Sequence, residues 1–209
     1  MLITSPAFGD DIIAERVAVI ASSLPAGALV VQLRDKVRAQ TSFRLFAWQL
    51  RRVTKACGAR LVVNGRLDVA RDVGADGVHL GNGAGRADDA RRVLGPASWI
   101  SVAAHSAEDV TAARAEGADA VLVSPVFMTQ SDAKDGRRKT PRGLECIRSA
   151  RLRAGPELLV YALGGVSAAT AQACADAGAD GVAVTRALLS ADDPAREARA
   201  IHDVWARRW

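Results

Sequence analysis

Residues 158–186 read LLVYALGGVSAATAQACADAGADGVAVTR and contain a complete strand, helix and strand unit. The apolar run Leu158 to Leu163 ends at Gly164 and Gly165, and Ser167 follows at the position of a helix N-cap. Two adjacent glycines let backbone N–H groups approach a ligand, and a helix N-terminus adds partial positive charge. The stretch therefore predicts either a plain tight turn or a phosphate site.

The second strand of this unit, Gly181 to Val184, ends at Thr185. Neighbouring parallel strands end at the same edge of a sheet, because a crossover helix returns the chain to the opposite edge between them. We therefore expect Val184 and Thr185 to lie beside Gly164 and Gly165 and to complete the predicted phosphate site.

A short pattern recurs along the chain. It reads VGADGVHLG at 73–81, EGADAVLVS at 116–124 and AGADGVAVT at 177–185. In each copy a glycine stands where a helix would end, since a left-handed residue is needed there, and a short apolar strand follows. Alanine-rich stretches of helical period, 107–116 and 168–177, precede two of the copies. Strands that alternate with helices predict parallel pairing and a crossover fold.

The remaining chain divides in the same way. We predict strands at 2–4, 28–33, 60–64, 77–80, 98–102, 120–123, 158–163 and 181–184. We predict helices at 10–22, 42–57, 67–73, 86–94, 107–116, 143–151, 168–177 and 194–207. This alternation predicts an α/β fold with one domain over residues 1–209, a (β/α)8 TIM barrel. The alternative is a doubly wound open sheet, whose G-x-G-x-x-G fingerprint is missing from the first strand–helix turn.

Composition narrows the class of protein. With 49% hydrophobic residues the chain can bury a core without disulfides or metal, and we interpret Cys57, Cys146 and Cys174 as reduced packing residues. The net charge of +5 comes with only 4% aromatic residues, which argues against a nucleic-acid interface. The sequence shows no membrane span and no signal peptide, so we expect a cytoplasmic protein. A homo-oligomer is compatible with these features.

Polar side chains stand at or just after the ends of several predicted strands. They are Gln32, Arg34, Lys36, Asn64, His105, Thr129 and Ser131. In a (β/α)8 barrel the carboxyl ends of the strands form the ligand-binding face. If the second strand persists, period two points Gln32, Arg34 and Lys36 the same way, which suits a diphosphate; a solvated charge run is the alternative. His79 lies inside a strand and is interpreted as a core residue.

The segment Lys134 to Arg142, KDGRRKTPR, concentrates positive charge around glycine and proline. These residues predict a loop, because they interrupt both helical and strand patterns. The loop is either an exposed surface segment or a lid over an anionic ligand.

Several stretches of the chain resemble the thiamine-phosphate synthases and the related thiazole tautomerases. The segments VVQLRDK, LVVNGRLDVARDVGADGVHLG, ISVAAHS, GADAVLVSPVFMT and ALGGV…AGADGVAV occur in that family's order and spacing. The resemblance implies a barrel that binds a hydroxyethylthiazole phosphate. For the synthases it also implies a hydroxymethylpyrimidine diphosphate with Mg²⁺. There the diphosphate leaves, a pyrimidine-methyl cation forms, and the thiazole nitrogen captures it.

The resemblance implies roles for single residues. The positions that match the pyrimidine diphosphate side are Gln32, Arg34, Lys36 and Asn64. The positions that match the thiazole phosphate side are Thr129, Gly164 and Gly165, with Ser131 in place of a threonine. Arg34 and Lys36 are then catalytic candidates, because their charge opposes that of the leaving diphosphate.

The chain also departs from both family patterns. Gly65 and Ala84 replace the two aspartates that hold magnesium in the synthases, so two hard oxygen ligands are missing. Ala103 replaces a serine, and Asp132 replaces a lysine unless Lys134 takes over its role. The histidine that precedes a Val-Phe pair in the tautomerases is Pro125 here.

Three hypotheses for function stay open. The first is a thiamine-biosynthesis synthase with altered use of Mg²⁺. The second is a metal-free isomerase of a thiazole phosphate or related heterocycle, with His105 or His79 as the candidate base. The third is a non-catalytic binder of a phosphorylated ligand. In each case we expect the partner to be a small phosphorylated heterocycle.

Overall fold

The computed structural model describes residues 1–129 and 140–206, and these form alternating strands and helices. The strands are β1 Leu2–Ile3, β2 Val30–Leu33, β3 Arg60–Asn64, β4 Gly77–Leu80, β5 Trp99–Ala104, β6 Ala120–Val123, β7 Leu159–Leu163 and β8 Gly181–Ala183. The helices are α1 Asp10–Ser22, α2 Gln40–Ala56, α3 Leu67–Asp72, α4 Ala87–Leu94, α5 Ala107–Ala115, α6 Glu145–Ala154, α7 Ala168–Asp176, α8 Arg186–Leu189 and α9 Pro194–Ala206.

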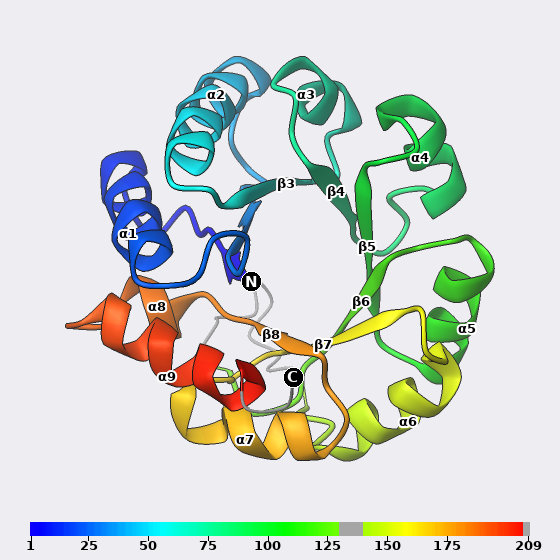
Figure 1. Cartoon of the computed structure of the whole chain (residues 1–209). Coiled ribbons are helices and arrows are strands. Elements are labelled where there is room, and N and C mark those ends of the chain that lie inside the picture. Colours follow the sequence, from blue (N-terminus) through cyan, green and yellow to red (C-terminus); the bar gives the residue numbers. More distant parts are fainter. Residues whose placement is uncertain (130–139, 207–209) are drawn as a thin grey trace.

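The strands form one parallel sheet that closes on itself. Strands β1 to β8 pair in sequence order, and a parallel bridge between Leu2 and Val184 joins the two edges. The N–H of Ile3 donates to the Val184 carbonyl at 2.8 Å, and the N–H of Val184 donates to the Met1 carbonyl at 3.0 Å. Figure 1 shows the inner ring of strands surrounded by helices. The predicted (β/α)8 barrel is confirmed.

Most element boundaries lie within two residues of the predicted ones. Strand β2 starts at Val30 instead of Ala28, because the N–H of Ala28 donates to the Pro25 carbonyl in a turn. Strand β5 continues to Ala104, so Ala103 lies within the strand. The short helix α8 was not predicted, since four residues show no helical period.

A repeated contact anchors the starts of β4, β6 and β8. Asp119 precedes β6, and its Oδ2 accepts hydrogen bonds from the N–H of Ile100 at 2.6 Å and from the Arg91 guanidinium at 2.9 Å. The equivalent sets are Asp76 with Leu61 and Arg51, and Asp180 with Val160 and Arg151. These aspartates are those of the recurring Gly-Ala-Asp pattern. The pattern therefore carries an ion pair that ties helix to sheet.

The interior of the barrel has an apolar half and a polar half. On one side Ile3, Leu122 and Ala183 pack against Met1, Tyr161 and Leu163. On the other side lie the polar residues Gln32, Asn64, His79 and Ser101. The pairing register puts them there, since Ile3 pairs with Gln32, Asn64 with His79, and His79 with Ser101. Among the described residues, no helix is long and apolar enough to cross a membrane.

Candidate functional site

Backbone pairing continues past the end of β2 and fixes the direction of Arg34. The Thr4 hydroxyl accepts a hydrogen bond from the N–H of Arg34 at 2.9 Å, and the N–H of Thr4 donates to the Gln32 carbonyl at 2.9 Å. Arg34 thus continues the extended chain on the interior side that buried Gln32 already faces. The role of Thr4 was not predicted, because nothing in the sequence marks a hydroxyl as a strand partner.

The residue after Arg34 points the other way and fixes the loop. The Asp35 carboxylate accepts hydrogen bonds from the N–H groups of Val37 and Arg38, both at 3.1 Å, and from Arg38 Nε at 3.0 Å. Arg38 also binds both oxygens of Asp10 at 2.7 Å. These hydrogen bonds hold the pKa of Asp35 below its ordinary value even though burial opposes the shift. Lys36 sits at the bend that this network holds.

Asn64, His79 and Ser101 form a neutral polar row across β3, β4 and β5. His79 Nδ1 lies 3.0 Å from Ser101 Oγ, and both side chains are buried. Burial, together with the smaller effect of the charges of Arg34 and Lys36, lowers the pKa of His79 to about 4. His79 is therefore uncharged near neutral pH, and both cations are close enough to the polar half of the barrel to act on it.

Arg34 and Lys36 are two cations at the end of β2 that no described carboxylate neutralises. Within residues 1–129 and 140–206, neither side chain has a hydrogen bond or ion pair. Neighbouring arginines are occupied: Arg38 is held by two aspartates. Arg66 donates to the Arg38 carbonyl at 2.7 Å and stacks 4.0 Å from the Phe43 ring centroid. An anion at the end of β2 would meet Arg34 and Lys36.

Gly164 and Gly165 follow β7, and both have positive φ values of 102° and 66°. A Cβ on Gly165 would lie 2.4 Å from the Met128 carbonyl oxygen, so the loop after β6 packs directly on this turn. The N–H of Phe127 donates to the Gly164 carbonyl at 2.9 Å. The pair therefore serves the contact between two loops, as well as offering the backbone donors that a phosphate needs.

The helix after the glycines is already capped. Ser167 and Thr170 form a capping box at the start of α7, and the N–H of Ala168 donates to Glu197 of α9 at 2.8 Å. Among the described residues, the N–H groups of Gly165 and Val166 have no hydrogen-bond partner. The donors open to an anion thus lie in the glycine turn, just before the helix begins.

The predicted residues after β8 differ in what they can offer. Both backbone groups of Val184 are used to close the barrel onto β1, so its N–H cannot bind a phosphate as well. Thr185 occupies the N-cap position of the short helix α8, and its carbonyl accepts from Leu188 and Leu189. Thr185 is therefore the candidate that offers a hydroxyl here, since that hydroxyl makes no cap hydrogen bond within the described residues, and the pairing of Val184 with β1 fixes its position.

His105 lies just beyond β5 and is held from three sides. Its Nδ1 is 2.9 Å from the Ser124 carbonyl, its N–H donates to Asp109 Oδ2 at 2.7 Å, and its carbonyl accepts from Arg142. A carbonyl can only accept, so Nδ1 carries a proton, and Nε2 is the nitrogen that holds the lone pair in the neutral tautomer. His105 is thus arranged as a potential base.

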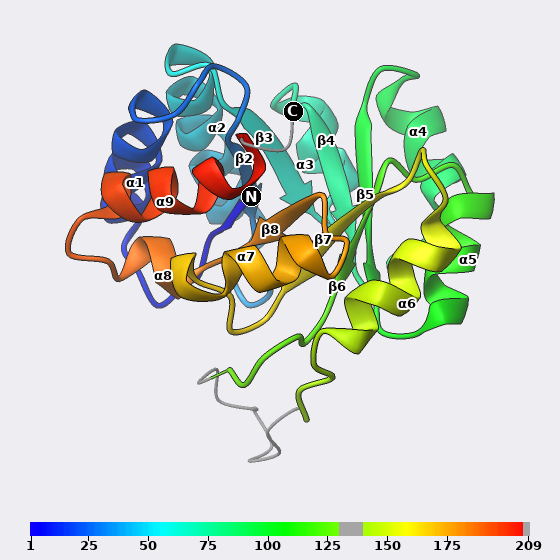
Figure 2. The same cartoon turned by 60° about the horizontal axis from the view of Figure 1, so that its bottom comes forward.

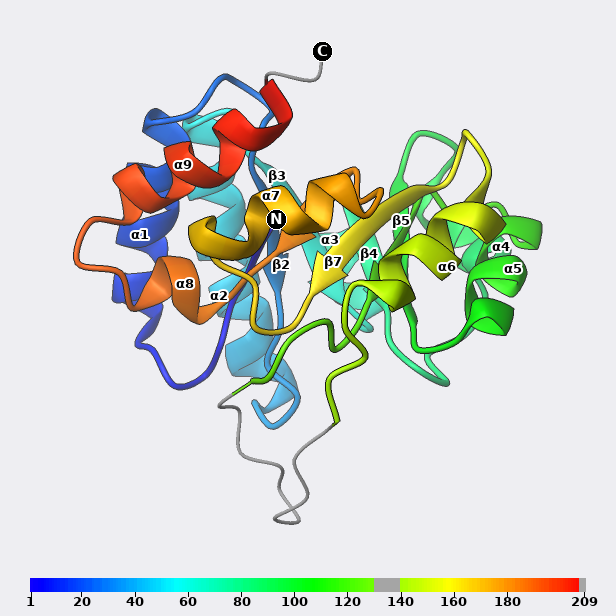
Figure 3. The same ribbon diagram turned by 90° about the horizontal axis from the view of Figure 1, so that it is seen from below.

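The segments next to residues 130–139 leave the barrel together. The N–H of Arg142 donates to the Pro125 carbonyl at 2.9 Å, and the N–H of Gly143 donates to the Val126 carbonyl at 2.9 Å. Figures 2 and 3 show these segments projecting from one end of the barrel. Thr129 lies in the first of them. Ser131, Asp132 and Lys134 lie outside the described residues, as does most of the predicted basic loop.

The carboxylates around the site do not fit a magnesium ion. Asp35 is saturated by Arg38 and two N–H groups, and Asp68 accepts from Gln40 at 2.5 Å and from Arg44 at 3.1 Å. Gly65 and Ala84 offer no side-chain oxygen. In the part of the chain that the structure describes, no cluster of three acidic, histidine or cysteine ligands occurs. The described residues supply no octahedral oxygen site.

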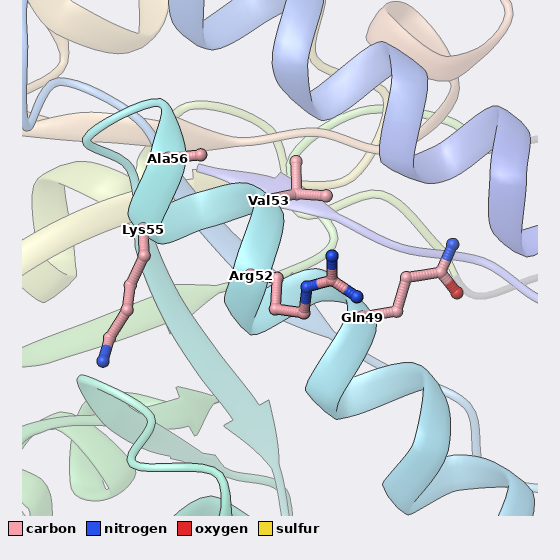
Figure 4. A pocket seen from close by; sticks show the side chains of 5 residues that line it. All are labelled: Gln49, Arg52, Val53, Lys55 and Ala56. Atoms are coloured by element: carbon pink, nitrogen blue, oxygen red, sulfur yellow. The ribbon is translucent and has the colours of Figure 1, made fainter.

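A separate hollow lies on the outside of α2. Gln49, Arg52, Val53, Lys55 and Ala56 line it, and Figure 4 shows that all five come from this one helix. It contains none of the residues at the strand ends. We therefore place the candidate site at the barrel end and not in this hollow.

Comparisons with known proteins agree with the barrel fold. The family described as thiamine monophosphate synthase matches residues 1–188. A putative thiamine-phosphate synthase of Geobacter sulfurreducens is 38% identical over 184 residues, which cover 88% of this chain and 84% of that protein. A thiamine-phosphate synthase of Methanoculleus marisnigri is 40% identical over 179 residues, or 85% of this chain and 82% of that protein. The solved thiamine phosphate pyrophosphorylase of Pyrococcus furiosus superposes with a TM-score of 0.80 at 27% identity, covering 99% and 94% of the two chains.

Proposed function

The chain belongs to the thiamine monophosphate synthase family, and from this premise we propose that it joins hydroxymethylpyrimidine diphosphate to hydroxyethylthiazole phosphate. In this reaction the bond between the pyrimidine methylene carbon and the diphosphate oxygen breaks, and pyrophosphate leaves with the electron pair. The thiazole nitrogen then forms the new bond to that carbon. The products are thiamine phosphate and pyrophosphate.

The two halves of the barrel end suit the two substrates. Arg34 and Lys36 would bind the diphosphate and stabilise its charge as the bond breaks. Gln32 and Asn64 would hydrogen-bond the pyrimidine. The residues that bind the thiazole phosphate would be Thr129, Ser131, Gly164, Gly165, Val184 and Thr185. Val184 would contribute by holding Thr185 in place, because its own backbone groups pair with β1.

One observation carries this proposal beyond family membership. Arg34 is fixed on the interior side of β2 by Thr4, and it has no anionic partner among the described residues. Arg34 is partly buried beside the polar residues of the barrel, so an anionic ligand there would form a charge-assisted hydrogen bond with it. A substrate whose leaving group is a diphosphate supplies such an anion.

The direct test is pyrophosphate release from the two substrates, measured with purified protein. Arg34→Ala should lower kcat/KM by at least tenfold, because a desolvated charge-assisted contact contributes about 1.5 to 3 kcal/mol. Arg52→Ala is the matched control, since Arg52 is an exposed cation on the outside of α2. Absence of release by the parent protein would overturn the proposal.

A second candidate function rests on His105. Its Nε2 lone pair is kept free by the bond from Nδ1 to the Ser124 carbonyl, as a base that moves a proton on a thiazole ring requires. This isomerase reading predicts exchange of a carbon-bound proton of the thiazole phosphate with deuterium from solvent, without any metal. His105→Gln should abolish the exchange. A protein that binds the thiazole phosphate without exchange or pyrophosphate release would be a binder.

A further inference from the structure

We propose that the end of β2 binds a diphosphate group directly through Arg34 and Lys36, and that magnesium weakens this binding. The ligand class rests on the proposed function. The sign of the magnesium effect rests on the residues of this chain alone. It is opposite to that expected of a site in which aspartates hold the metal against the diphosphate.

The first step concerns the carboxylate that lies between the two cations in the sequence. Asp35 stands between Arg34 and Lys36 in sequence, yet it faces the other side of the loop, where it binds Arg38. Arg38 in turn binds Asp10 through two contacts of 2.7 Å. Because Asp35 is buried and occupied, freeing it for a metal would leave Arg38 with one of its two partners missing.

The second step concerns the other side of the site. Asp68 is occupied by Gln40 and Arg44, and Asn64, His79 and Ser101 are neutral. The positions 65 and 84 carry glycine and alanine. Among the described residues, the polar half of the barrel end therefore combines two free cations with no free carboxylate.

The third step follows from charge. A doubly charged cation brought beside Arg34 and Lys36 is repelled by both, and no described carboxylate offsets the repulsion. Pyrophosphate that already carries magnesium has two fewer negative charges to offer the same two cations. Free pyrophosphate should thus bind more tightly than its magnesium complex.

The test is calorimetric titration of the purified protein with inorganic pyrophosphate. We expect binding in buffer with EDTA and at least tenfold weaker binding in excess Mg²⁺ at matched ionic strength. Arg34→Ala and Lys36→Ala should each weaken the metal-free binding at least tenfold, and Arg52→Ala should leave it unchanged. Binding that requires Mg²⁺, or no binding in either buffer, would overturn the proposal.

A gain-of-metal variant tests the same idea in the opposite direction. Gly65→Asp with Ala84→Asp restores the two carboxylates, and aspartate is one of the residues that tolerate the φ of +71° at position 65. We expect Mg²⁺ to strengthen pyrophosphate binding by the variant. If the double variant does not fold, Ala84→Asp alone can be tested. Position 84 has a negative φ, so aspartate causes no backbone strain there. A variant that still binds more weakly with Mg²⁺ would count against the charge argument.

Failure of this inference differs from failure of the proposed function. If the parent releases pyrophosphate from the two substrates only with Mg²⁺, and binds pyrophosphate only with Mg²⁺, the synthase function stands and this inference falls. If the parent binds pyrophosphate without metal but releases none from the substrates, the inference stands and the synthase function falls.

Discussion

At the scale of single residues, the polar half of the barrel depends on a histidine that stays neutral. His79 is buried, hydrogen-bonded to Ser101, and near the charges of Arg34 and Lys36. A protonated imidazole there would add a third positive charge to the site. The sequence indicated a satisfied core histidine, and this was correct. It did not reveal Ser101 as the partner, because that contact depends on the register between β4 and β5.

Replacing His79 should change how stability depends on pH. The folded-state pKa of about 4 lies below the ordinary 6.5, so between these values the unfolded chain binds more protons and stability falls as pH falls. From pH 7 to 4.5 this amounts to about 2 kcal/mol. In His79→Asn this part of the loss should disappear in urea unfolding, whereas His202→Asn should keep it. An unchanged loss in His79→Asn would contradict the burial argument.

The position of the Arg34 charge should be measurable through the pKa of His79. Its charge lowers the pKa of the imidazole, so Arg34→Ala should raise that pKa, as followed by NMR titration of the ring protons. Lys36→Ala should act in the same direction. The Arg52→Ala variant serves as the comparison, since its charge lies on the outside of α2. An unmoved His79 pKa in Arg34→Ala would show that the guanidinium does not lie over the polar half.

At the scale of elements, the barrel end is built from loops that touch each other across strands. The turn after β7 packs against the segment after β6, and Val126 and Phe127 donate to Leu163 and Gly164. The sequence predicted the glycine turn from its apolar run and helix cap. It could not predict the contact with Met128, because loop-to-loop packing leaves no periodic signal.

Gly165→Ala should disturb both loops at once. An added Cβ would lie 2.4 Å from the Met128 carbonyl oxygen and 2.8 Å from the Phe127 Cβ, and the φ of +66° disfavours alanine. We expect a loss of unfolding free energy of about 1 to 3 kcal/mol and weaker binding of a thiazole phosphate. Gly58→Ala, at a φ of +69° with one contact at 3.8 Å, separates the backbone cost from the loop contact. Equal stability losses in the two variants would argue against loop packing.

At the scale of the whole molecule, the barrel consists of repeated pairs of strands. Asp76, Asp119 and Asp180 each precede an even-numbered strand, accept from the backbone of the strand before it, and pair with an arginine of an earlier helix. The recurring sequence pattern predicted the fold because it marks this repeat. The arginine partners, which lie 25 to 29 residues earlier in the chain, were not predicted.

The strand pair β5 and β6, which Asp119 joins, offers a test of whether the two ends of the barrel serve separately for stability and for ligand binding. Asp119 lies before β6, at the strand's amino end, whereas the candidate site lies at the carboxyl ends. Asp119→Ala removes a charged acceptor from the Ile100 N–H and leaves Arg91 with its bonds to the carbonyls of Pro96, Ser98 and Gly117.

We expect Asp119→Ala to lower the unfolding free energy by about 2 to 3 kcal/mol, since the carboxylate serves a backbone donor and a guanidinium together. Arg91→Ala should cost nearly as much. Arg92→Ala, next along α4, is the matched control, because Arg92 is 72% exposed and its ion pairs contribute about 0 to 1 kcal/mol. Below the unfolding temperature, binding of pyrophosphate should be the same in all three variants. A weakened pyrophosphate affinity in Asp119→Ala would mean that the two ends of the barrel are coupled.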